Sequence, residues 1–186
     1  MRFETDYPGA VAAFKGEALR TLDDGHARFR HVLGQLDDAQ VWHRPHPGMN
    51  AVGNLVLHVC GSLTQWIAVG CDPARDRSGS AGDGRDRPAA FAAAGGETCA
   101  ALAVRLASVV TGAADAMQLL NKDHLLEPRT IQGVGVTGMG AVWHGVAHLQ
   151  AHAQEAVYAT RLIRGDLYDT RGASGVDGPG VSPDAG

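Results

Sequence analysis

Apolar side chains recur at helical spacing in separate stretches of the chain, and this pattern predicts helices. Over residues 10–36 the apolar positions form one stripe of Val11, Phe14, Ala18, Leu22, Phe29, Leu33 and Leu36. A stripe of this kind is typical of a helix that buries one side against its neighbours. Comparable helical stretches occur over about residues 50–67, 97–120 and 138–164.

Capping and breaking residues mark where the expected helices begin and end. Asn50 is a favourable N-cap for the second helix, and Thr137 is one for the fourth. Gly165 is expected to end the fourth helix, since glycine is common just past a helix C-terminus. Pro45 and Pro47 prevent the first helix from continuing through the loop before Asn50.

Two of the connecting segments have a character of their own. Residues 71–90 are rich in Gly, Asp, Arg and Ser without periodicity, so we expect a long surface loop there. In residues 130–138, β-branched residues flank a Gln-Gly pair, which is typical of a small hairpin. With little other strand signal, the pattern predicts an all-α fold: a four-helix bundle with a small hairpin or loop before its last helix.

Length and composition favour one domain in a reducing compartment. We expect a single bundle domain over residues 1–170, large enough to form a core without disulfides, and a disordered Gly/Pro/Ser-rich tail over residues 171–186. The three cysteines, Cys60, Cys71 and Cys99, are odd in number and lack CxxC spacing. They are therefore expected to be free thiols of a cytoplasmic protein.

Charge and hydropathy exclude several classes of partner. The chain has 16 basic and 20 acidic residues, a net charge of −4, which gives no electrostatic reason to bind nucleic acid or an anionic membrane. The first residues lack the apolar segment of a signal peptide. The longest apolar run is interrupted by Asn54, His58 and Gln65, which a lipid-facing helix would not carry without partners. We expect neither nucleic acid nor a membrane among the partners.

Three of the nine histidines lie at four-residue intervals in the fourth helix. One narrow face of that helix carries His144, His148, His152 and Glu155. The cations of the helix, Arg161 and Arg164, lie on the opposite side, so we expect the histidine face to point inward.

The second helix carries a comparable polar stripe without any charge. The stripe consists of Asn54, His58, Ser62 and Gln65, and no Asp, Glu, Lys or Arg occurs between residues 50 and 70. One interpretation is a weakly polar solvent face. The other is a buried stripe that lines a site, because a solvent face normally carries charges.

Facing imidazoles in a bundle core would favour a divalent metal. Buried polar groups need partners, and an i,i+4 histidine pair with one imidazole from another helix forms a three-ligand set. Three protein ligands leave coordination positions open, as in catalytic sites. A lone HxxxH pair is more often packing or surface, so the third histidine carries the argument. A di-iron bundle is excluded because its Glu-x-x-His motifs are absent.

The segments "GMNAVGNLVLHVCGSLTQWIAVG" and "HGVAHLQAHAQEAVYATRLIRG" resemble the DinB/YfiT-like superfamily of metal-dependent enzymes. The resemblance extends over about residues 42–167 and includes "RDRPAAF" and "RTIQGVGVTGMGAV". It implies a four-helix bundle whose divalent metal, zinc or nickel, is held by His58, His148 and His152. It also implies activation of a low-molecular-weight thiol for transfer or isomerisation. Similar sequences often carry an acid where this chain has Ala90, which puts any role of that acid in doubt.

Other residues near the proposed site have two interpretations each. Glu155 either orients His152 or a metal-bound water, or is a surface charge. His144 is favoured as a packing residue or a neighbour of the ligands, and His26 as a core residue. The arginines of two RDR triplets either bind an acidic substrate or belong to a solvated loop, which is favoured; they are Arg75, Arg77, Arg85 and Arg87.

The function expected from the sequence is transfer of a small thiol to a small electrophile by a metal-dependent enzyme. The alternatives are a non-catalytic protein that binds a divalent metal or small ligand, with His26 or His144 as a fourth ligand, and a metal-dependent hydrolase. We also expect a homodimer that pairs through the first helix or through an exposed apolar strip of the fourth, formed by Val142, Val146, Ala153 and Val157.

Overall fold

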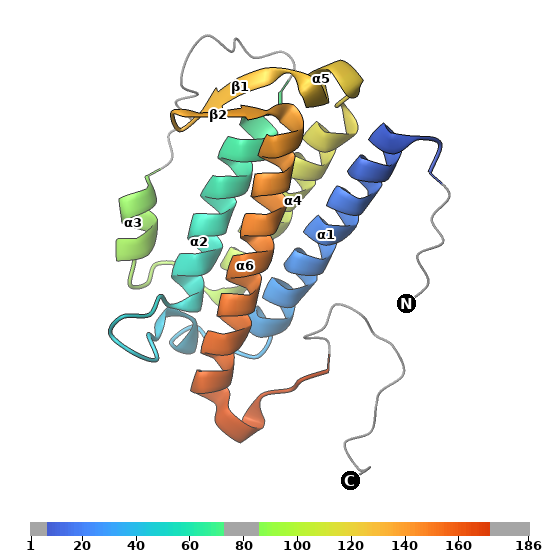
Figure 1. Cartoon of the computed structure of the whole chain (residues 1–186). Helices are drawn as coiled ribbons and strands as arrows, with labels where there is room; N and C mark the ends of the chain where they lie inside the picture. Colours follow the sequence, from blue (N-terminus) through green and yellow to red (C-terminus); the bar gives the residue numbers. More distant parts are fainter. Residues whose placement is uncertain (1–6, 73–85, 172–186) are drawn as a thin grey trace.

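In the computed structural model, the described residues are 7–72 and 86–171, and four long helices dominate them (Figure 1). The expected all-α bundle is therefore confirmed. The four helices are α1 (Ala10–Leu33), α2 (Val52–Leu63), α4 (Cys99–Gln118) and α6 (Gly138–Arg164). The helical path of α2 continues through a π-helical segment, η2 (Thr64–Val69).

The helices form a ring in which α4 and α6 lie diagonally opposite. Both α1 and α2 pack against α4 and against α6. Apolar side chains from all four helices meet in one core. The largest of these side chains have no exposed surface; they include Phe29, Leu55, Leu106 and Leu149. Burial of each such side chain contributes roughly 1.5–3 kcal/mol, so the fold has a core independent of any bound ion.

Shorter elements connect the long ones: η1 (Gln40–Trp42), α3 (Arg87–Ala92), α5 (Lys122–Leu126) and η3 (Gly165–Leu167). The expectation of irregular loop through residues 71–90 is wrong at its end, where α3 begins. The Asp86 carboxylate accepts a hydrogen bond of 2.8 Å from the Ala89 amide, and Pro88 suits the first turn of a helix. The rest of that loop, residues 73–85, and the tail from residue 172 lie outside the described residues.

The expected hairpin is present across one end of the bundle (Figure 1). Strands β1 (Pro128–Ile131) and β2 (Val134–Thr137) pair antiparallel, with Arg129 opposite Val136. The turn residues Gln132 and Gly133 have φ of 54° and 76°, the left-handed values that a two-residue hairpin turn requires.

Helix ends follow two of the three expected signals. The Thr137 hydroxyl accepts a hydrogen bond of 3.1 Å from the Gly140 amide at the start of α6, and Gly165 ends that helix with φ of 55°. Asn50, however, is not the N-cap of α2. That position is Ala51, whose amide donates to Oδ1 of Asn54 at 3.1 Å. The side chain of Asn54, in the first turn of the helix, therefore takes the role expected of Asn50.

The apolar strip expected to be exposed on α6 is buried instead. Val142, Val146, Ala153 and Val157 are each at most 2% exposed and belong to the core. Because this side of the helix packs into the bundle, it is not available for a dimer. The histidine side faces the boundary with α2.

Two helical stretches are long and apolar enough to be membrane spans by length and composition alone. They are Val52–Val69, 72% of which is buried inside the protein, and Cys99–Gln118, whose most apolar 18-residue stretch is 22% buried. The first behaves as a core helix of the bundle. The second is α4, which buries one face against the core, with Leu102, Leu106 and Ala113 on it.

Candidate metal centre

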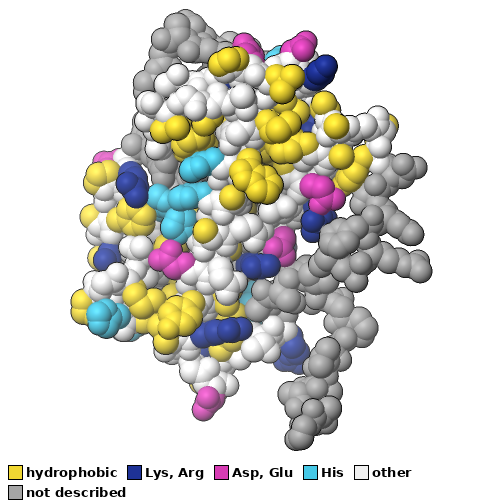
Figure 2. Space-filling view, viewed as in Figure 1, with side chains coloured by type: hydrophobic (Ala, Val, Ile, Leu, Met, Phe, Trp, Pro, Cys, Tyr) yellow, Lys and Arg dark blue, Asp and Glu magenta, His cyan; other side chains and the backbone are white. Residues whose placement is uncertain are grey.

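The histidine faces of α2 and α6 meet near the middle of both helices. His58 of α2 is 3% exposed, whereas His148 and His152 of α6 are only partly buried. In Figure 2 histidine side chains gather on one face of the molecule, beside hydrophobic groups. The α6 face expected to point inward is therefore only partly buried, whereas the burial of His58 agrees with the interpretation of the α2 stripe as buried.

The three predicted ligands lie within coordinating range of one another. One donor nitrogen from each of His58, His148 and His152 lies within 4.8 Å of the other two. Nε2 of His58 lies 2.8 Å from Nε2 of His148. The ring of His152 is 4.8 Å from that of His58 and 4.5 Å from that of His148, centre to centre.

This donor set fits a divalent cation. Metal–nitrogen bonds of about 2.1 Å hold neighbouring imidazole nitrogens roughly 3 Å apart, close to the spacing seen for His58 and His148. Imidazole is a ligand that suits zinc and nickel alike, so the donors alone do not select between these metals. A group of three close donors is a possible metal site, and the partial exposure of two of them leaves access for a further ligand.

Glu155 fixes the orientation of one of these imidazoles. Its Oε2 lies 2.8 Å from Nδ1 of His152, and Nδ2 of Asn50 donates to its Oε1 at 3.4 Å. The hydrogen bond with His152 lowers the pKa of Glu155 below its ordinary value, against the opposing effect of burial. A carboxylate on Nδ1 leaves Nε2 of His152 with a lone pair for a cation.

Phe91 of α3 covers one side of His58. The two rings lie 4.5 Å apart, centre to centre. The fully buried Asn54 holds α3 there, since its Nδ2 donates to the carbonyls of Ala90 and Ala93 at 2.9 and 2.7 Å. The Arg44 guanidinium adds a hydrogen bond of 2.6 Å to the Phe91 carbonyl.

Asn54 therefore belongs to the support of the site, which favours the second interpretation of the α2 stripe. Ala90, where similar sequences often carry an acid, supplies its backbone carbonyl to Asn54. Sequence reasoning missed Phe91, Arg44 and Asn50 as neighbours of the centre. These contacts join segments far apart in the chain, so sequence periodicity could not reveal them. The one signal was the position of Phe91 within "RDRPAAF", a segment that resembles the family.

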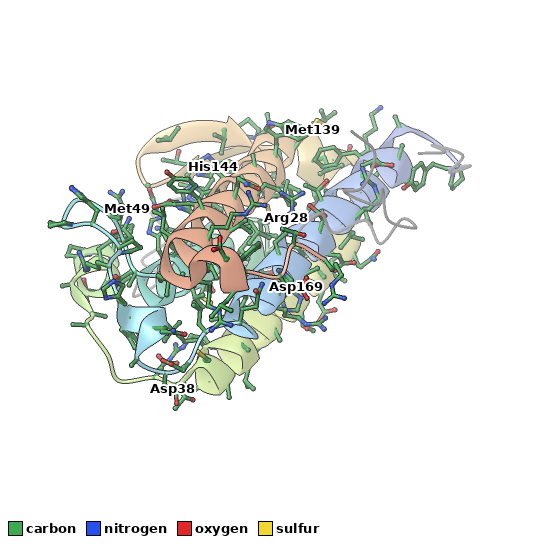
Figure 3. The ribbon with its side chains drawn as sticks, turned by 90° about the horizontal axis from the view of Figure 1, so that it is seen from below. Arg28, Asp38, Met49, Met139, His144 and Asp169 are labelled. Carbon is green, nitrogen blue, oxygen red and sulfur yellow. The ribbon has the colours of Figure 1, made fainter. Side chains whose placement is uncertain are left out.

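Further residues of the two stripes lie towards the hairpin. His144 is exposed and stacks on Trp66, with ring centres 3.8 Å apart; Figure 3 labels it on α6. Nε2 of Gln132 in the hairpin turn donates to Oε1 of Gln65. The contact between His144 and Trp66 agrees with the interpretation of His144 as a packing residue beside the ligands. His144 is not part of the donor cluster.

The remaining candidates lie elsewhere or outside the described residues. His26 is half-buried in α1, where burial and Arg30 lower its pKa, and it is not part of the donor cluster. Of the RDR arginines, Arg87 begins α3 with its guanidinium 5.5 Å from the Phe91 ring centre. Those at positions 75, 77 and 85 are outside the described residues.

The cysteines are protonated residues away from the donor cluster. Burial raises the pKa of Cys60 to about 12 and that of Cys71 to about 11. For Cys99, burial and the neighbouring Asp38 raise the pKa to about 11. Among the described residues, no cysteine joins His58, His148 and His152.

Comparisons with known proteins place this geometry in a family. The family model described as DinB superfamily matches residues 21–156, a range that contains the three histidines. No curated protein matches the chain. A crystal structure described as that of a conserved protein from Enterococcus faecalis aligns with a TM-score of 0.63 and 20% identity, over 81% of this chain and 96% of that one. At that identity the likeness concerns the fold.

Proposed function

Since the chain belongs to the DinB superfamily, we propose that it is a metal-dependent enzyme that transfers a low-molecular-weight thiol to a small electrophile. The observation that carries the proposal is the convergence of three imidazoles at a partly exposed position between α2 and α6. We propose His58, His148 and His152 as ligands of one zinc or nickel ion.

The chemistry of the donors suits this reaction. A divalent ion held by neutral imidazoles keeps its full positive charge, and so lowers the pKa of a thiol or water bound to it. Around the ion, the residues of this chain have supporting tasks. Glu155 keeps the proton of His152 on Nδ1, and Asn50 holds Glu155 in place.

The thiol is proposed to come from outside the protein. The pKa values of Cys60, Cys71 and Cys99 lie near 11 or 12, so these side chains carry almost no thiolate at neutral pH. A cosubstrate that reaches the exposed side of the imidazoles avoids this restriction. We also propose a cytoplasmic location, where such thiols are kept reduced.

The surroundings of His58 favour a substrate with a negative group. The guanidinium of Arg87 lies over the outer ring of Phe91, and that ring contacts His58. The guanidinium of Arg44 lies on the Phe91 carbonyl. Two cations at this edge of the site would attract a carboxylate on the thiol or on the electrophile.

The test combines metal analysis with an assay of thiol transfer. Purified protein is loaded with zinc or nickel, and glutathione, mycothiol and bacillithiol are screened against chlorinated or unsaturated acceptors. We expect one metal per chain and metal-dependent transfer, and loss of both in His148→Ala and His152→Ala. His26→Gln is the matched control, because it removes a histidine outside the donor cluster.

Two other results would replace the proposal. Metal-dependent hydrolysis of an ester or amide without thiol transfer would make the protein a hydrolase. Metal binding without turnover, combined with loss of metal in His26→Gln or His144→Ala, would favour a closed site with a fourth ligand and a binding protein.

A further inference from the structure

Helix α3 is weakly attached to the bundle, although it covers a proposed ligand of the metal. Figure 1 shows it outside the ring of four long helices, beside α2. None of its six residues is buried. A segment without buried side chains gains little from the hydrophobic effect, so α3 can move away from α2 while the core of the bundle stays intact.

The contacts that hold α3 are hydrogen bonds, apart from one aromatic ring. Nδ2 of the buried Asn54 donates to the carbonyls of Ala90 and Ala93 at 2.9 and 2.7 Å. The Arg44 guanidinium donates to the Phe91 carbonyl at 2.6 Å. Water can replace these donors when α3 moves away, so the net contribution of each bond to the attachment is modest.

Two adjacent glycines lie between α3 and α4. Gly95 and Gly96 are both exposed, and Gly96 has φ of 103°, a value that residues with a side chain rarely adopt. The chain is anchored again directly after them, because Nε1 of Trp42 donates to the Glu97 carbonyl at 2.8 Å. Flexible residues between a weakly held helix and a firmly held one are the arrangement of a hinge.

We propose that α3 is a lid on the candidate metal centre, which opens by rotation about Gly95 and Gly96 and closes when Phe91 packs on His58. In the closed arrangement of this structure the two rings lie 4.5 Å apart, and His58 is 3% exposed. Opening removes the Phe91 ring and makes the α2 side of the centre accessible. The lid admits the electrophile and then keeps water away from the centre, a role that rests on the proposed function.

The two halves of the Asn54 amide have different partners. Oδ1 accepts from the Ala51 amide at 3.1 Å and from Arg44 at 3.3 Å, so it holds the start of α2. Nδ2 donates to the two carbonyls of the lid segment. Asn54→Asp keeps the first set of bonds and places an oxygen against both carbonyls. This variant therefore separates the lid from the support of α2.

Carbethoxylation of His58 by diethyl pyrocarbonate measures opening of the lid in the full, metal-free chain. The reagent modifies accessible imidazoles, and peptide mass spectrometry reports each site. We expect wild-type His58 to react more slowly than the exposed His144. Below the unfolding transition its rate should hardly change with urea, because opening of the lid exposes little surface and global unfolding exposes much.

Loss of the contacts to α3 should raise this rate. Asn54→Asp opens the lid and Phe91→Ala removes its ring, and each is expected to speed the reaction of His58 at least about tenfold. The control for the first is Asn121→Asp, because Asn121 caps α5 through Oδ1, which aspartate retains. Circular dichroism checks that each variant keeps its helices.

The hinge is tested by a variant of its own. An added Cβ at Gly96 would meet nothing within 4 Å, but alanine disfavours the φ of 103° that the closed lid requires. Gly96→Ala should therefore raise the rate of His58 about tenfold, at the same low urea dependence. Gly112→Ala is the control, since Gly112 is equally free of neighbours and lies in regular helix.

Three results would overturn the proposal. Wild-type His58 that reacts only when urea unfolds the whole chain would make α3 a fixed cover. His58 that reacts as fast as His144 would mean that α3 does not cover it. Equal rates for Asn54→Asp, Gly96→Ala and their controls would exclude both the attachment and the hinge. The assay uses neither metal nor thiol, so failure of the lid and failure of the proposed thiol transfer are distinguishable.

Discussion

Glu155 determines which nitrogen of His152 carries the proton. With Oε2 at 2.8 Å from Nδ1, the carboxylate accepts a hydrogen bond from the Nδ1–H group and leaves the lone pair of Nε2 to a cation. Of the two interpretations that the sequence allowed, orientation of His152 agrees with this contact. Sequence periodicity could place Glu155 on the histidine face, but only the folded chain brings Asn50 to its other oxygen at 3.4 Å.

Replacement of Glu155 should weaken metal binding without removing it. Glu155→Gln keeps an oxygen that can accept from Nδ1, so we expect about a tenfold loss of metal affinity, and about a hundredfold loss for Glu155→Ala. Competition with a chromogenic chelator measures both. Equal affinities for wild type and Glu155→Ala would mean that the carboxylate is a surface charge after all.

The cysteines should be unreactive in the folded protein. With pKa values of about 12 for Cys60 and about 11 for Cys71 and Cys99, the thiolate fraction at pH 8 is far below that of an ordinary cysteine. Because burial raises these pKa values, the thiolates appear only as pH approaches them. Alkylation by iodoacetamide should be slow at pH 8 and become fast in denaturant. Rapid labelling of a native thiol would contradict the proposal of an external cosubstrate.

At the scale of elements, periodicity predicted where the long helices lie in the chain, but not which face of α6 packs against the other helices. The 3.6-residue repeat identifies which positions share a face, and Thr137 and Gly165 mark real ends of α6. The repeat does not determine which of two apolar faces of a helix is buried in the core. Val142 and Val146 belong to a face that packs inward. The large apolar side chains that α6 exposes are others, among them Trp143, Tyr158 and Leu162. The short α3 was missed because six residues carry too little periodic signal.

A buried arginine joins the hairpin to the end of η2 and to α5. Arg129 is 6% exposed, and its guanidinium donates to the carbonyls of Gly70 and His124 at 2.8 and 3.2 Å. Arg129→Met keeps the length of the side chain but leaves both carbonyls without this donor, so we expect unfolding free energy to fall by about 2–4 kcal/mol. Urea denaturation measures it, with Arg20→Met as the exposed control. A loss no larger than that of Arg20→Met would show that the hairpin is held by other contacts.

At the scale of the whole molecule, the bundle has an apolar core that does not include the three histidines. The polar stripes of two helices offered one interpretation in which their histidines converge, and the family resemblance selected His58, His148 and His152 from those stripes. It could not predict that the site opens at the surface, since that depends on where α3 and the loop before α2 lie. Phe91 and Arg44 reach the site from those segments.

Removal of metal should therefore lower the melting temperature without unfolding the protein. Side chains such as Phe29 and Leu106 are fully buried in contacts that no ion supports, so the helices should remain. An ion present at a hundred times its dissociation constant stabilises the folded state by about 2.7 kcal/mol, and chelation removes that increment. Circular dichroism during heating, with and without chelator, measures both quantities. His148→Ala should melt at the same temperature in either condition, because it has already lost the ion. If chelation instead abolished the helical signal at room temperature, the three histidines would be a structural site on which the bundle depends, and the open, catalytic interpretation would lose its basis.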